Sequence, residues 1–331
     1  MRTTADMTDI QLALDRKARF RELVVSVLPF TGFTFICLFL IAVTEGRILN
    51  PSNLGNLLNQ CFTVTLVAVG ASFVYAHGGM DFSIGGSSGL AQLVCALLIV
   101  RGFPLWSAIL ACVLTSLACA LTVGGTSLLL RVPVFVASLC MRAICLGLLA
   151  TGVVQNSITI DYSQFLRFHS VPLKLAILVL FIGIGYYLFE CTALGKREKA
   201  IGGNEIVARQ AGVRTGGVRL LAYALLGLCV GVAAFFQLTR SGVVTGSSGG
   251  GLEFDIMVAI VLGGFPMMGG SAARLRAVVV GALTITILTN GLVLWGLDFN
   301  LVNGVKGLLF LIIVGISYDR SNQNQISFVG S

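Results

Sequence analysis

Charged side chains are scarce in this sequence. Asp, Glu, Lys and Arg make up 11% of its 331 residues, whereas a soluble domain averages about 25%. So few charges cannot cover a water-facing surface, and 56% of the residues are hydrophobic. The composition therefore predicts an all-α, polytopic membrane protein in which one helical bundle uses most of the chain.

Catalytic and metal-binding side chains are also few. His77 and His169 are the only histidines, which disfavours a histidine-based metal site or a serine hydrolase in this chain. The nine cysteines include no C-x-x-C pair and lie mostly in apolar runs, so we expect buried thiols without a metal or a disulfide framework. Neither a P-loop nor a G-x-G-x-x-G loop occurs, and we expect no nucleotide or other cofactor on this chain.

Basic residues outnumber acidic ones, with a net charge of +8. In a membrane protein this excess fits loops held at the cytoplasmic surface better than it fits nucleic-acid binding. With a cytoplasmic N-terminus and ten helices, 15 of the 22 Lys and Arg residues fall on the inner side and five on the outer side. This asymmetry predicts that both termini are cytoplasmic.

Ten apolar runs predict about ten transmembrane helices, because a spanning helix needs about 20 mostly apolar residues. We expect a transmembrane domain over 24–318 between cytoplasmic segments 1–23 and 319–331. Aspartates precede the first basic cluster, unlike the start of a cleaved signal peptide, so the first run is expected to remain as a membrane helix. The runs are 24–44, 57–76, 87–101, 104–125, 133–153, 172–190, 218–237, 254–270, 276–296 and 301–317.

The longest polar segment, 191–217, lies on the cytoplasmic side in this topology. It reads CTALGKREKAIGGNEIVARQAGVRTGG, and its part from Asn204 to Ala211 contains no Gly or Pro. Asn204 suits an N-cap, Glu205 suits the first turn, where the helix dipole favours an acid, and Gly212 suits the C-terminal cap. The pattern predicts a short capped helix along the inner membrane face.

A second polar stretch, HGGMDFSIGGSSGL from His77, separates two apolar runs. An ionisable side chain at the centre of a membrane helix costs about 2.5–3.5 kcal/mol on insertion scales, and non-helical backbone survives there only when protein or a wet cavity covers it. Asp81, with glycines on both sides, fits a broken helix that faces such a cavity. It equally fits a tight cytoplasmic turn in which Asp81 caps the next helix near Ser83. The residues alone leave both interpretations open.

This stretch shows a short internal sequence similarity to a later one. GGMDFSIGG at 78–86 and EFDIMVAIVLGG at 253–264 both join an acidic residue to paired glycines beside an apolar run. Inverted five-helix repeats, as in some transporters, are therefore a hypothesis. Three other features within helices are a packing notch at Gly227 and Gly231, an interhelical hydrogen bond or pathway contact at Asn290, and an outward-extended side chain at Lys306.

Several motifs occur together in one order. GGMDFSIGG is followed by RVPVFVASL at 131–139, AIGGNEIVARQAGV at 200–213, LEFDIMVAIVLGG at 252–264, TNGLVLWGL at 289–297 and VNGVKGLLFLIIV at 302–314. The first resembles the GG-[IM]-D-L-S-V-G signature of the ribose-type permeases of bacterial ABC importers. The third resembles their cytoplasmic A-I-G-G-N-E-x-A-A-x-x-x-G-I loop. The resemblance extends over about residues 50–318.

The resemblance implies a bacterial inner-membrane permease subunit that imports simple sugars. It would work with a second permease, identical or paralogous, with cytoplasmic ATPase subunits that bind ATP and Mg²⁺, and with an extracytoplasmic sugar-binding protein. The cytoplasmic loop would be the coupling helix that docks on the ATPase, through Gly202, Gly203, Asn204, Glu205, Ile206, Val207, Ala208 and Gly212. The translocation pathway and its core are expected to include Gly79, Asp81, Ser83 and Asn290.

The chain departs from the family pattern at three places, and at one of them Val123-Gly124 stands where the family has Asn-Gly before R-V-P. The usual Glu-Ala-Ala of the loop corresponds to Ile206, Val207 and Ala208, which predicts a more apolar docking face. An arginine common in the family is replaced by Leu146, while Arg142 lies four residues earlier on the same helical face.

These departures leave the solute open. A monosaccharide is favoured, and a nucleoside or a sugar-derived signal is the alternative within ABC import. An ion-coupled secondary transporter, with Asp81 as a proton or sodium site, is the alternative from another class. A membrane enzyme is a more distant one.

Overall fold

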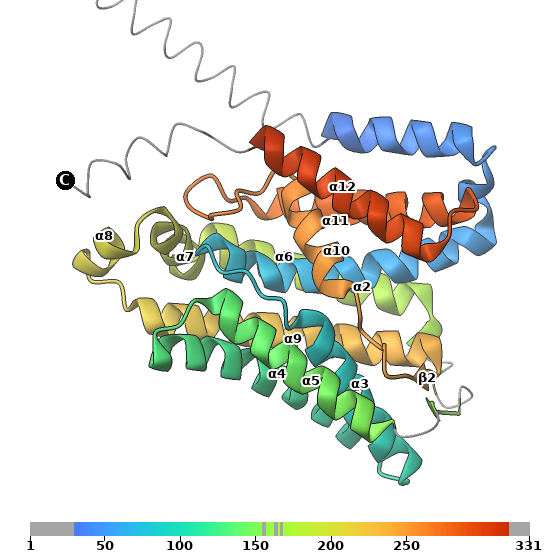
Figure 1. Ribbon diagram of the computed structural model, residues 1–331, viewed down its shortest axis with the longest axis horizontal. Helices are drawn as coiled ribbons and strands as arrows, with labels where there is room; N and C mark the ends of the chain where they lie inside the picture. Colours follow the sequence, from blue (N-terminus) through green and yellow to red (C-terminus); the bar gives the residue numbers. More distant parts are fainter. Residues whose placement is uncertain (1–29, 154–156, 162–164, 166–167, 318–331) are drawn as a thin grey trace, which may run out of the picture.

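The computed structural model describes residues 30–153, 157–161, 165 and 168–317, and every structural statement below concerns these residues. The expected cytoplasmic segments 1–23 and 319–331 lie outside the described residues. The described chain is almost entirely helical (Figure 1), which confirms the all-α prediction. Its helices are an N-terminal helix (Phe30–Val43), α2 (Pro51–Ala76), α3 (Ile84–Val100), α4 (Leu105–Leu130), α5 (Val134–Gly152), α6 (Val171–Tyr186), α7 (Ala193–Gly203), α8 (Glu205–Gln210), α9 (Thr215–Ser241), α10 (Leu252–Leu262), α11 (Leu275–Leu294) and α12 (Phe299–Ser317).

Short elements join these helices. A 3₁₀ turn, η1 (Arg47–Leu49), precedes α2, and a π-helical turn, η3 (Tyr187–Cys191), continues α6. Two strands of two residues each, β1 (Ile158–Thr159) and β2 (Val243–Val244), pair antiparallel.

Six helical segments are long and apolar enough to cross a membrane: α2, α4, α5, α6 with η3, α9 and α11. The N-terminal helix, α3 and most of α12 are shorter apolar helices. The run 254–270 does not form one helix, because α10 has 11 residues and ends at Leu262. It is followed by Gly264, Gly269 and Gly270 with positive φ, and by Pro266, which has no N–H to donate. The count of ten spans therefore remains a prediction.

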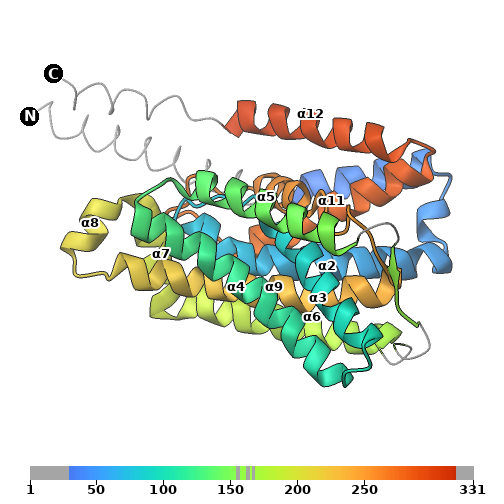
Figure 2. The same ribbon diagram turned by 60° about the horizontal axis from the view of Figure 1, so that its bottom comes forward.

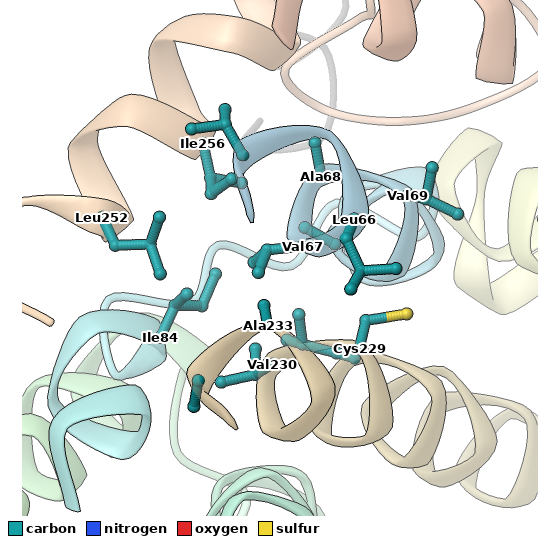
Figure 3. Close-up of a cluster of buried hydrophobic side chains, with 14 of the residues drawn as sticks. Leu66, Val67, Ala68, Val69, Ile84, Cys229, Val230, Ala233, Leu252 and Ile256 are labelled. Atoms are coloured by element: carbon teal, nitrogen blue, oxygen red, sulfur yellow. The ribbon is translucent and has the colours of Figure 1, made fainter. Parts of the chain in front are cut away.

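The core forms around the second half of α2, from Cys61 to Ala76, which is mostly apolar and almost entirely buried, as expected of a helix covered by others on all sides. Val67 lies at the centre of a cluster with Ile84 of α3, Ala233 of α9 and Ile256 of α10 (Figure 3). On α9, a Cβ at Gly227 would lie 2.7 Å from the Cα of Leu117 on α4. The predicted packing notch is thereby confirmed, since only glycine permits so close an approach.

Two helices, α3 and α10, begin near the middle of the bundle after a non-helical segment. After α2 the chain runs without helical structure over 77–83, back along the bundle, and α3 begins close to its middle (Figure 1). After α9 the chain is again non-helical over 242–251, and α10 also begins near the middle. The first turns of α3 and α10 are in contact there, because a Cβ at Gly85 would collide with the carboxylate of Glu253.

Candidate functional site

The predicted capped helix is present as α8, at one end of the molecule (Figure 1 and Figure 2). Asn204 caps it, since its side-chain oxygen accepts a hydrogen bond of 3.1 Å from the Val207 N–H. Gly212 follows the helix with φ +82°, the left-handed conformation that ends helices. Open space surrounds Gly212, so a side chain there meets mainly the backbone cost of about 1–2 kcal/mol.

Glu205 connects α8 to the start of α9. Its carboxylate lies 2.9 Å from Nη2 of Arg209 and 2.7 Å from Nη2 of Arg219. Burial acts to raise the pKa of Glu205, but the hydrogen bonds and charges of Arg219 and Arg209 outweigh it, so the pKa is lowered. These contacts are therefore full above the ordinary glutamate pKa and weaken as the pH falls through the lowered value.

The three residues at the positions of the usual Glu-Ala-Ala, of which Ala208 is retained, lie on two faces of α8. Ile206 and Val207 are 70% and 58% exposed. Ala208 is buried, in a small cluster with Ile201 of α7 and Val218 of α9. Ile206 and Val207 thus point away from the molecule, while Ala208 packs α8 against α7 and α9.

The helix α7 was missed by the sequence analysis. Thr192 caps it through a hydrogen bond of 3.2 Å from the Leu194 N–H, and a threonine before ALGKREKAI is the signal that indicates such a start. A Cβ at Gly202 would collide with the Ala76 carbonyl oxygen and lie 2.6 Å from the Gly270 nitrogen. The Gly270 N–H donates to that same carbonyl at 3.0 Å. Three backbones therefore meet at Gly202, where side chains are excluded.

Asp81 is buried in the non-helical segment after α2. Its Oδ1 accepts hydrogen bonds from the Ser83 N–H at 2.7 Å and the Ser83 hydroxyl at 2.6 Å. The segment is held further by Ser138 of α5, whose hydroxyl accepts the Phe82 N–H at 3.1 Å. Asp81 thus organises the start of α3 as a cap would, but within the bundle and not at an exposed turn.

Glu253 and Arg142 form an ion pair where the first turns of α3 and α10 meet. Nη2 of Arg142, on α5, lies 2.8 Å from Oε1 of Glu253, in the first turn of α10. The glutamate side chain is 1% exposed and the arginine side chain 34% exposed. The sequence analysis singled out Glu253 in the motif at 253–264 and Arg142 as the arginine four residues before Leu146. It did not predict that the two residues pair.

Two other polar side chains within helices have partners across the bundle. Asn290 and Asn53 exchange two amide hydrogen bonds, of 2.9 and 3.1 Å, which joins α11 to α2. This accords with the interhelical interpretation of Asn290. The expectation that Lys306 extends outward is wrong, because its Nζ lies 2.6 Å from Oδ1 of Asp255 on α10.

Arg142→Met is expected to destabilise the permease by about 3–5 kcal/mol, because it leaves the buried Glu253 carboxylate without its partner. A second change, Glu253→Gln, should restore most of this loss by removing the uncompensated charge. The measurement is the unfolding midpoint of the purified permease in detergent, with exposed Arg101→Met as control. A double variant as unstable as Arg142→Met alone would show that the pair does not account for the loss.

The fold, with six helices long and apolar enough to cross a membrane, is the one expected of a multi-pass helical membrane protein. Residues 53–314 match the family described as the permease component of the branched-chain amino acid transport system, and the chain belongs to this family of transport permeases. The family is one of transport permeases and not of enzymes.

Curated relatives agree with this assignment. The chain is 31% identical over 303 residues to the ribose import permease protein RbsC of Bacillus subtilis, and this alignment covers 88% of this chain and 92% of the relative. It is 32% identical over 288 residues to the galactofuranose transporter permease protein of Escherichia coli, with 85% and 83% covered. It is 28% identical over 284 residues to the autoinducer 2 import system permease protein of Shigella flexneri, with 82% and 80% covered. No solved structure matches the chain. The resemblance to ribose-type ABC permeases is confirmed.

Proposed function

We propose that this chain is the membrane permease subunit of an ABC importer that carries a monosaccharide or a related small polar solute into a bacterial cell. The observation that carries the proposal is the match to a ribose import permease over 92% of that relative's length. A match of this extent covers the broken helices and α8 together, so it concerns the whole transport unit and not one motif.

The parts of the chain divide the work as follows. The α8 helix docks on a cytoplasmic ATPase subunit, which binds ATP and Mg²⁺, while this chain binds no cofactor. A second permease, identical or paralogous, completes the pathway, and an extracytoplasmic binding protein delivers the solute. Gly79, Asp81 and Ser83 shape the pathway at the broken helix, and Asn290 supports it through Asn53.

The topology follows from the basic residues. Both termini lie in the cytoplasm, with about ten membrane-crossing segments in the inner membrane. The helices α3 and α10 support an inverted repeat, since each follows a long helix and a non-helical segment and each begins near the middle of the bundle.

The solute class has one favoured candidate and one alternative. Relatives named for ribose and galactofuranose favour a monosaccharide. A relative named for autoinducer 2 import favours a sugar-derived signal as the second candidate.

The test uses the permease reconstituted in proteoliposomes with its ATPase and binding protein. Radiolabelled ribose is the first probe, followed by other pentoses and hexoses that bind the binding protein. We expect uptake that needs ATP and the loaded binding protein and stops with vanadate. Ionophores that collapse ion gradients should leave it unchanged. Uptake driven by a proton or sodium gradient without ATP would instead indicate a secondary transporter with Asp81 as the ion site.

A further inference from the structure

His77 and Glu198 form a buried pair at the junction between α2 and α7. Nδ1 of His77 lies 2.7 Å from Oε2 of Glu198, and the two side chains are 1% and 0% exposed. Nε2 of His77 and Oε1 of Glu198 have no hydrogen-bond partner among the described residues. Each side chain therefore finds its polar partner in the other, across 121 residues of sequence.

The surrounding residues are shaped to enclose this pair. A Cβ at Gly79 would lie 3.0 Å from Nε2 of His77, so the glycine leaves room for the imidazole. The ring of Tyr223, on α9, lies 6.2 Å from the imidazole, centroid to centroid. Gly124 of α4 in turn leaves room for Tyr223, because a Cβ there would lie 2.6 Å from that ring. The segment after α2, α7 and Tyr223 of α9 thus enclose the pair, and α4 packs behind Tyr223.

The pair joins the helix that leads to α8 with the segment that contains Asp81. Glu198 is on α7, which continues through Asn204 directly into α8. His77 follows the last residue of α2 and begins the segment that contains Asp81. A load applied at α8 is passed through α7 to the segment that contains Asp81 when α7 and the end of α2 move together.

We propose that His77 and Glu198 are positioning residues that fix α7 to the end of α2, so that movement of the ATPase at α8 is transmitted to the Asp81 segment. The proposal rests on the proposed function, because it requires α8 to be the docking helix. The Gly202 junction brings the backbones together, and the His77–Glu198 pair holds them there. This role requires no contact of either side chain with the solute or with ATP.

The coupling through the His77–Glu198 pair is expected to depend on pH. The charged and titratable groups that act on the pair are Arg219 and Tyr223 from α9. Tyr223 in turn lies near Tyr75 of α2 and Asp81 of the following segment. Burial raises the pKa of Glu198, with His77 and Arg219 opposing the rise. A group with a raised pKa stabilises the folded contact fully below its ordinary pKa and loses that contribution as the pH rises through the raised value. Coupling should therefore weaken with rising pH, and Glu198→Gln should remove that dependence.

The test compares Glu198→Gln, His77→Gln and the double variant in the reconstituted complex, with exposed Arg197→Gln on the same helix as control. We expect each single variant to insert and to co-purify with the ATPase, but to lower ribose transported per ATP hydrolysed by at least about tenfold. The double variant should be no worse than either single one, because the two residues act as one unit. Arg197→Gln should match the wild type.

Two results would overturn the proposal. One is a wild-type ratio of transport to hydrolysis in both single variants across the pH range. The other is loss of ATPase co-purification in step with transport, which a purely structural role would produce. If the wild-type complex hydrolyses ATP but carries no ribose, the proposed sugar function fails separately. The variants are then compared by how far the loaded binding protein stimulates hydrolysis, and unchanged stimulation would refute the positioning role.

Discussion

A methyl group added at Gly202 is expected to destabilise the permease and abolish transport, whereas the same change at Gly203 is expected to leave its stability intact. The Cβ of Gly202→Ala would collide with the Ala76 carbonyl oxygen, which already accepts the Gly270 N–H. Backbone atoms cannot rotate away, so α2, α7 and the 263–274 segment would have to separate. Overpacking of this kind costs about 1–3 kcal/mol, and the broken hydrogen bond adds about 1 kcal/mol.

Gly203 provides the matched control, since it is the neighbouring residue of the same helix and no atom lies within 4 Å of its Cβ position. Gly203→Ala should keep or slightly raise stability, because alanine favours a helix by about 0.5–1 kcal/mol over glycine. The unfolding midpoint of the purified permease measures both changes without the ATPase, and uptake in proteoliposomes follows. Equal midpoints for the two variants would show that the three backbones do not meet at Gly202 as described.

The sequence predicted α8 well because its signals are local. The Asn204 cap reaches Val207, three residues away, and Gly212 supplies the left-handed turn by itself. The same logic missed α7 within the polar segment 191–217, because the stability of α7 comes from buried contacts of Glu198 and Ile201 with other elements. Capping residues within a few positions of each other could be identified from the sequence, whereas contacts between distant elements could not.

Hydropathy overestimated the eighth apolar run for a related reason. It counts side chains, but α10 ends where the backbone requires glycine: a Cβ at Gly263 would collide with the Ala277 carbonyl of α11, and one at Gly281 with the Ala259 carbonyl of α10. These glycines permit two helices to approach closely, a property of the pair and not of either run.

The ion pairs show that the sequence does not identify which charged residues are partners. Glu253 with Arg142, and Lys306 with Asp255, join residues far apart in sequence. An acidic or basic residue within an apolar run can be recognised as costly and therefore as partnered. Which residue is the partner depends on how the helices pack, so Lys306 was expected to extend outward although Asp255 lies beside it.

The largest effect on assembly is expected from Ile206→Asp combined with Val207→Asp. Both side chains are exposed on α8, and an apolar pair of this kind suits the charge-poor core of an interface. Two carboxylates there would be buried without partners when the ATPase docks, so we expect ATPase affinity to fall by at least about tenfold. The unfolding midpoint of the permease alone should change little, because exposed substitutions shift stability by only about 0.5 kcal/mol.

Gln210→Asp is the matched control, because it adds a negative charge to the same helix at an exposed position. It should retain ATPase co-purification and the hydrolysis that the loaded binding protein stimulates, while the double variant loses both. Ala208→Asp should behave differently again and destabilise the permease itself, since Ala208 packs on Ile201 and Val218. If the Ile206 and Val207 double variant co-purifies and is stimulated like the wild type, the docking surface lies elsewhere. The 263–274 segment is then the next candidate, because its Met268 is 75% exposed at the same end of the molecule and Gly270 joins it to α7.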